Sequence, residues 1–317
     1  MFEKLLAPGK IGKMQLRNHV LMSPTETHFT SPDGMINWAE IDYYVERAKG
    51  GAALITTHQM QGNTRIDPID PYPRSARFDD DCFIPMLTEL TEAVHNEGAK
   101  ISALASPGGG AQALGMPYDA GTLEDIPNVA PGTIECPVAK RKVRKLTVEE
   151  IKKSVEVFGK GCGRLKRCGF DAITIHAHCG YLIAEFLSPY FNNRDDEYGG
   201  SLENRARFLL ELVAACRENI GPNMPIIVRL AMDEFIGDAG RQLAETVELC
   251  KMLEAAGVDA LDCGAGLFQT MSLISPPVYY EKGFMADMTD EIKKAVSIPA
   301  IVQGRLQDPE VAEKVLE

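Results

Sequence analysis

The run Pro225-Ile226-Ile227-Val228-Arg229-Leu230-Ala231 decides the fold that the sequence predicts. Its apolar, β-branched residues follow one another without alternating with polar residues. This pattern is typical of a strand that is buried on both faces, as the strands of parallel sheets are. The run therefore predicts a central strand of a parallel sheet with helices covering it.

Similar short apolar runs recur along the chain, and a longer stretch with helical spacing follows each of them. The expected strands are 19–23, 52–57, 100–106, 171–177, 225–231, 258–264 and 298–304. The expected helices are 38–48, 82–97, 147–168, 201–219, 241–256, 286–296 and 308–317. One helix start is marked by Thr147-Val148-Glu149-Glu150, a capping box. Seven alternations of strand and helix predict parallel βαβ units.

The first strand–helix turn separates two ways of arranging these units. A doubly wound open sheet carries a glycine fingerprint in that turn, whereas this chain has Ser23-Pro24-Thr25-Glu26. We therefore expect an α/β fold of the (β/α)8 TIM-barrel type. Seven βα units are present and the eighth is absent from the 317 residues, which are expected to form one domain.

Composition excludes several classes of function. The net charge of −12 argues against a nucleic-acid partner, which needs a clustered basic surface. No stretch approaches the roughly 20 apolar residues of a membrane helix. The eight cysteines contain no Cys-x-x-Cys pair, so structural zinc and iron–sulfur spacings are absent and free thiols in a reducing cytoplasm are expected.

In a barrel, chemistry belongs to the residues that follow the strands. The segment from His176 to Tyr181 is the richest of these. His176 and His178 are two residues apart, so in extended backbone they point the same way. One alternative is therefore a metal-dependent hydrolase in which they bind a metal with Asp233 or Asp262.

Three other strand ends suggest a ligand. Arg229 ends a buried strand and needs a partner, either an internal carboxylate or an anionic ligand, and its position favours the ligand. Gly304 and Arg305 allow close backbone approach beside a positive charge, which suits a phosphate. The long connection 107–145 is expected to be an unstructured cover over the pocket.

The longest motif runs from His176-Ala177-His178-Cys179-Gly180-Tyr181 to Pro189, and it continues from Asn193 through Arg205. This motif resembles the old yellow enzyme family, nearest to its 2,4-dienoyl-CoA reductase-like and NADH:flavin oxidoreductase branch. Residues 2–18 resemble the opening of that family as well. The resemblance covers essentially the whole chain and implies an FMN-binding barrel.

The resemblance implies a role for each candidate site residue. The residues it assigns to FMN are Pro24, Thr25, Glu26, His58, Arg229, Gly304 and Arg305. Among them, Arg229 would contact the pyrimidine edge, and Gly304 with Arg305 would bind the phosphate. No metal is implied. A 4Fe–4S cluster and FAD occur only in longer family members, beyond the barrel.

The implied reaction reduces the C=C bond of an α,β-unsaturated carbonyl compound such as an enone, enoate or dienoyl thioester. NADH or NADPH supplies hydride through flavin N5. His176 and the Cys179 position, or His178 in its place, would hold the substrate carbonyl, and Tyr181 would protonate the α-carbon. The partner is this small molecule, and a homo-oligomer is compatible with the sequence.

Several positions depart from the family pattern. Cys179 stands where Asn or His is usual, Glu26 where Thr, Cys or His is, and His58 where a small residue is. Leu104 replaces a glutamine that bonds the pyrimidine. These changes leave a degenerate or fragmentary barrel without flavin catalysis as an alternative. Amine oxidation is disfavoured, because the single tryptophan, Trp38, is expected to pack in the core rather than to cage a cation.

Overall fold

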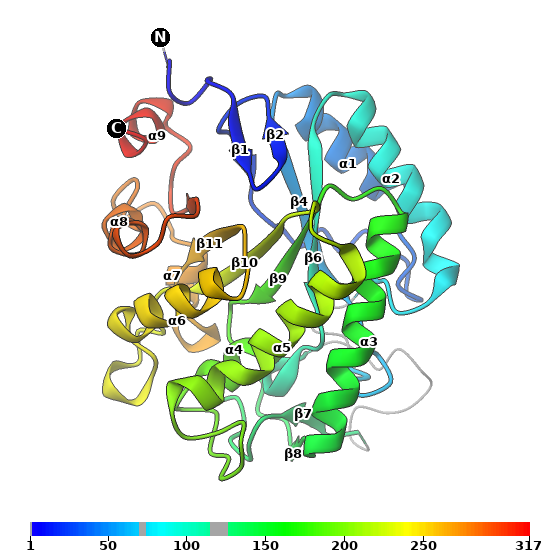
Figure 1. The fold of residues 1–317 in the computed structure, drawn as a ribbon, viewed down its shortest axis with the longest axis vertical. Coiled ribbons are helices and arrows are strands. Elements are labelled where there is room, and N and C mark those ends of the chain that lie inside the picture. Colours follow the sequence, from blue (N-terminus) through cyan, green and yellow to red (C-terminus); the bar gives the residue numbers. More distant parts are fainter. Residues whose placement is uncertain (1, 70–73, 115–125) are drawn as a thin grey trace.

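The computed structural model describes residues 2–69, 74–114 and 126–317. Its centre is a curled parallel sheet whose strands follow one another in chain order (Figure 1). From end to end these are β3 (Leu21–Met22), β4 (Leu54–Gln61), β6 (Lys100–Ser106), β9 (Ala172–Ala177), β10 (Ile226–Ala231), β11 (Ala260–Gly264) and β12 (Ala300–Val302). A two-residue strand, β5 (Ala76–Arg77), pairs with the end of β4. The predicted TIM-type α/β fold with seven βα units is confirmed.

Helices cover the outer face of the curled sheet, and each expected helix is present (Figure 1). They are α1 (Trp38–Lys49), α2 (Ile84–Asn96), α3 (Val148–Arg167), α5 (Leu202–Ile220), α6 (Leu243–Ala255), α8 (Ala286–Ala295) and α9 (Pro309–Val315). The main hydrophobic core fills the space between these helices and the strands. None of the described helices is long and apolar enough to cross a membrane.

Besides β5, six further short strands and α-helices of the described chain were not predicted, because each is too brief to show a period. They are β1 (Gly9–Ile11), β2 (Met14–Leu16), β7 (Asn128–Ala130), β8 (Val143–Lys145), α4 (Leu182–Leu187) and α7 (Met271–Ile274). The hairpin of β1 and β2 buries Ile11, Met14 and Leu16 against the first residues of the parallel strands. It therefore covers the amino-terminal end of the sheet, and its residues Ile11 and Leu16 also line the cavity between the two end strands.

The prediction for residues 107–145 was wrong in part. β7 and β8 form a parallel pair within this segment, and none of its described residues lines the cavity reported below. The physical reason is that the start of the segment is hydrogen-bonded to residues that do not line the cavity. Asp67 Oδ2 accepts a hydrogen bond from Gly110 N at 3.0 Å, and Glu185 Oε1 accepts one from Ala111 N at 2.8 Å. Residues 115–125 lie outside the described part of the chain.

The expectation that Trp38 packs in the core was also wrong, since its side chain is 61% exposed. Trp38 is the first residue of α1, directly after the N-cap Asn37. The buried stripe of this helix runs through Ile41, Tyr44 and Ala48, and Trp38 lies beyond its end.

The predicted capping box of α3 is formed. Glu150 N donates to Thr147 Oγ1 at 3.1 Å, and Thr147 N donates to Glu150 Oε2 at 2.9 Å. Two amides that the first helical turn leaves unpaired are thus satisfied. The helix buries Ile151, Phe158 and Leu165 along one face.

Thr147→Ala should lower the free energy of unfolding by about 1 kcal/mol, because the N-cap acceptor is lost. Thr147→Ser retains the hydroxyl and should be close to the native chain. Chemical denaturation of the three proteins measures the difference. Equal stability of the alanine and serine variants would show that the cap contributes nothing.

Candidate active site

A cavity of about 1000 Å³ lies at the carboxyl ends of the parallel strands and continues between the two end strands, β3 and β12. It brings together ten of the eleven residues that the sequence predicted for the site. The ten are Pro24, Thr25, Glu26, His58, His176, Cys179, Tyr181, Arg229, Gly304 and Arg305. His178 is the exception.

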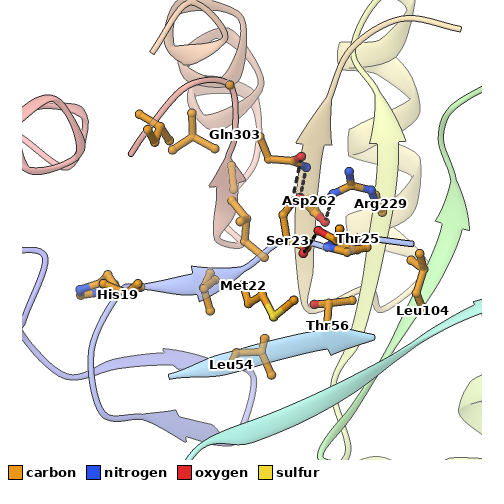
Figure 2. A pocket seen from close by; sticks show the side chains of 18 of the residues that line it. His19, Met22, Ser23, Thr25, Leu54, Thr56, Leu104, Arg229, Asp262 and Gln303 are labelled. Carbon is orange, nitrogen blue, oxygen red and sulfur yellow. Dashed lines mark hydrogen bonds and ion pairs between the residues drawn. The ribbon is translucent and has the colours of Figure 1, made fainter. Parts of the chain in front are cut away.

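Arg229 is paired within the protein. It stands beside Asp262 in the register of β10 and β11, and its Nη1 lies 2.8 Å from Asp262 Oδ2. Gln303 Nε2 donates to the other oxygen of Asp262, and Ser23 Oγ donates to Gln303 Oε1 at 3.1 Å. Figure 2 shows these side chains turned toward one another across the gap between the end strands. The internal carboxylate is therefore present, and Arg229 still lines the cavity.

His176 is a neutral imidazole next to this cation. It lies beside Arg229 in the register of β9 and β10 and is almost completely buried. Burial, together with the neighbouring Arg229 charge, lowers the pKa of His176 to about 3. Its Nδ1 has no hydrogen-bond partner among the described residues. The side chain can thus donate or accept one hydrogen bond in the cavity without carrying charge.

Cys179 lines the cavity in a left-handed backbone conformation, with φ of 61°, and Gly180 follows with φ of 82°. Burial raises the pKa of its thiol to about 12, so it stays protonated. His178 lies behind it, with Nδ1 at 2.7 Å from Cys179 Sγ. Burial lowers the pKa of His178 well below its usual value, so this ring is neutral too.

The rings of His176 and His178 lie nearly parallel, with centroids 6.4 Å apart, as the two-residue spacing predicted. Only His176 lines the cavity, however, whereas His178 contacts the Cys179 thiol. Within residues 2–69, 74–114 and 126–317, no group of three or more His, Cys, Asp or Glu side chains is arranged to hold a metal ion.

Tyr181 is positioned by the turn that follows β9. It is the N-cap residue of α4, and only 1% of it is exposed. Its ring centroid lies 5.3 Å from that of His176 and 5.7 Å from that of Phe268. The phenol and the neutral imidazole are therefore neighbours on one wall of the cavity.

Gly304 and Arg305 both adopt left-handed conformations, with φ of 91° and 56°. A Cβ on Gly304 would lie 2.9 Å from Met285 Cγ, so glycine is needed there for the close approach as well as for the backbone angle. Arg305 Nη1 donates to the carbonyl of Val278 at 2.6 Å and to that of Tyr280. The guanidinium thus secures a neighbouring loop, and the backbone at Gly304 remains at the cavity.

The unusual His58 is explained by a buried carboxylate that the sequence analysis did not identify. His58 Nδ1 lies 2.5 Å from Glu40 Oε1, and both side chains are fully buried. Ala76 N donates to His58 Nε2 at 3.1 Å, so the ring is held between this backbone amide and Glu40. Thr30 Oγ1 donates to Glu40 Oε2 at 2.6 Å. A glutamate within the apolar stripe of α1 was the signal that could have revealed it.

Glu26 lines the cavity beside this network. Its Oε2 is buried without a hydrogen-bond partner in the described structure. Burial raises its pKa, and the nearby Glu40 adds to the increase, while His58 and His28 oppose it. Glu40 differs, because its bonds to His58 and Thr30 outweigh the effect of burial and lower its pKa.

Comparison with known proteins identifies the family of the chain. A sequence model of the NADH:flavin oxidoreductase / NADH oxidase family matches residues 4–317. The chain is 37% identical to an NADH oxidase of Thermoanaerobacter brockii over 99% of its own length and 47% of that protein. It is 36% identical to a cinnamate reductase of Clostridium sporogenes over 98% of its length and 48% of that protein.

A solved complex of 2-naphthoyl-CoA reductase with 2-naphthoyl-CoA has a similar structure. It superimposes with a TM-score of 0.90 at 29% identity, covering 100% of this chain and 48% of that one. The chain thus spans about half the length of these larger proteins.

Glu40→Gln should lower the free energy of unfolding by about 1–3 kcal/mol at neutral pH, because it weakens a buried hydrogen-bonded pair. The pKa of Glu40 is lower in the folded chain than its ordinary value of 4.5. Its contribution is therefore present above that value and is lost as the pH falls through the folded pKa. The difference from the native chain should shrink in acid.

Thermal unfolding across the acid range measures this difference. Glu46→Gln is the matched control, since Glu46 lies on the same helix with its side chain 64% exposed. A difference between Glu40→Gln and the native chain that stays constant as the pH falls would contradict the assignment of an ionised Glu40.

Proposed function

Because the chain belongs to the NADH:flavin oxidoreductase / NADH oxidase family, as its resemblance to the old yellow enzymes predicted, we propose that it is an FMN-dependent reductase. Its substrate is an α,β-unsaturated carbonyl compound, whose C=C bond is reduced at the expense of NADH or NADPH. One observation carries this proposal: Tyr181 and the neutral His176 adjoin each other in the same cavity as Arg229. Residues 1–317 would form one FMN-binding domain.

The cavity has properties that suit FMN. Its volume of about 1000 Å³ lies at the upper end of the range for ligand sites. Two buried polar atoms of its lining residues, Glu26 Oε2 and His176 Nδ1, have no hydrogen-bond partner among the described residues. A polar ligand would satisfy them. Arg229 would hold the pyrimidine edge, the backbone of Pro24 and Thr25 would support the ring, and Gly304 would admit the phosphate. When bound, FMN supplies hydride transfer between the nicotinamide and the substrate carbon.

The residues of the chain itself would control the substrate oxygen and the proton. His176 is uncharged, and its ring N–H would donate a hydrogen bond to the carbonyl oxygen, where negative charge develops. Such a hydrogen bond stabilises the developing charge most strongly in a site that excludes water. Cys179 offers only a weak S–H donor beside it. Tyr181 would give its proton to the α-carbon as a general acid.

The names of two relatives support this substrate class. One is a cinnamate reductase and the other a 2-naphthoyl-CoA reductase. Cinnamate carries a C=C bond conjugated with a carboxyl group, and naphthoyl-CoA carries a ring conjugated with a thioester. We therefore propose an enone, an enoate or an unsaturated thioester as the substrate.

The visible absorbance spectrum of the purified chain, with chromatography of the released flavin, tests the cofactor. FMN should copurify with the native chain and with Thr147→Ala, and Arg229→Met should retain less of it, because the fixed cation is lost. A chain that stays colourless when supplied with FMN would overturn the proposal.

Tyr181→Phe should slow reoxidation of the reduced flavin by an enone by about a hundred- to ten-thousand-fold, the usual contribution of a general acid. Reduction by NADH or NADPH should be nearly unchanged, since no proton is delivered to substrate carbon in that half-reaction. Anaerobic stopped-flow absorbance measures the two steps separately. Equal losses in both would contradict the role of Tyr181.

A further inference from the structure

Gln59 is a polar residue of the cavity wall that takes no part in the proposed reaction. It lies on β4, lines the cavity and is only 3% exposed. Neither Oε1 nor Nε2 of its side chain has a hydrogen-bond partner among the described residues. Buried amides are nearly always satisfied, so a buried amide with both ends unpaired at a cavity needs an explanation.

The register of the sheet places this amide beside an apolar residue. Gln59 is the partner of Leu104 in the parallel pairing of β4 with β6, after an irregularity between Thr56 and Gln59. The Thr57 hydroxyl fixes that irregularity, because it accepts a hydrogen bond from Leu104 N at 3.1 Å and donates one to His58 O at 3.0 Å. Leu104 also lines the cavity, but it offers no group that could pair with the amide.

The chemistry of the amide defines what would satisfy it. A carboxamide presents one acceptor and donors side by side. Its complement is a ligand edge that carries a carbonyl oxygen next to a ring N–H, as a lactam or imide does. Arg229, which also lines the cavity, has donors alone and cannot recognise the N–H of such an edge.

We propose that Gln59 binds the imide edge of the flavin pyrimidine ring, with Nε2 donating to a ring carbonyl and Oε1 accepting from the ring N–H. This inference rests on the proposed function and deepens it. Gln59 is then a residue that recognises the ring N–H of the cofactor. The pairing also satisfies an amide that has no hydrogen-bond partner among the described residues.

The test compares FMN with N3-methyl-FMN, in which the ring N–H is replaced by a methyl group. Both are titrated into the flavin-free chain, and quenching of flavin fluorescence reports the dissociation constant. The native chain should bind FMN at least about tenfold more tightly, the ratio that one lost hydrogen bond produces. Gln59→Leu should bind FMN more weakly and should lose the discrimination between the two flavins.

Gln61→Leu is the matched control. Gln61 lies two residues further along β4 and does not line the cavity; it is also buried, and neither of its amide atoms has a hydrogen-bond partner in the described part of the chain. It should keep the discrimination of the native chain. Thermal unfolding of the flavin-free variants supplies a second measurement. Gln59→Leu should not lower the melting temperature, because it replaces an unsatisfied amide with an apolar group of similar size and removes no hydrogen bond to the described residues.

The outcomes separate this inference from the function beneath it. If FMN binds and Gln59→Leu still discriminates between the two flavins, the role of Gln59 is overturned and the flavin proposal stands. If Gln61→Leu loses the discrimination between the two flavins equally, that discrimination does not depend on a residue of the cavity wall, and the inference fails. If the native chain binds neither flavin, both proposals are overturned together.

Discussion

A fixed positive charge inside the curled sheet is the constraint on which the site depends. Arg229 is almost entirely buried, and an unpaired ion there would be very costly. Asp262 on the neighbouring strand compensates the charge. Gln303 and Ser23 extend the hydrogen-bond network from Asp262 across the space between β12 and β3. Residues of β10 and β11 and residues that follow β12 and β3 thus form one hydrogen-bonded chain. The charge therefore holds together the two ends of the sheet as well as the mouth of the cavity.

Burial, assisted by this charge at His176 and His178, determines the ionisation of the surrounding side chains. Burial and Arg229 keep His176 and His178 neutral, and burial keeps the Cys179 thiol protonated. Burial also favours the neutral form of Glu26, while the negative charge of the neighbouring network is confined to Glu40, behind the cavity wall. The wall thus combines the Arg229–Asp262 ion pair with several neutral donors and acceptors. Such a surface suits a polar ring system that gains electron density during the reaction.

Sequence alone predicted most of the fold, and ten of its eleven candidate site residues line one cavity, for physical reasons. Strands such as Ile226–Ala231 are apolar on both faces, and in a barrel the residues that follow such strands converge. What escaped prediction depends on tertiary detail. The neighbour of Leu104 is set by an irregularity at Thr57 and His58, and the position of His178 behind the cavity is set by the left-handed Cys179. Glu40 was hidden because its partner lies on a different element.

The strand order has a consequence for how the chain folds. Each parallel strand pairs with the next one along the sequence, so the sheet can grow one unit at a time as the polypeptide leaves the ribosome. The bond between Ser23 and Gln303 is different, because it joins residues 280 positions apart. The cavity mouth therefore takes its final form only after β12 has been synthesised.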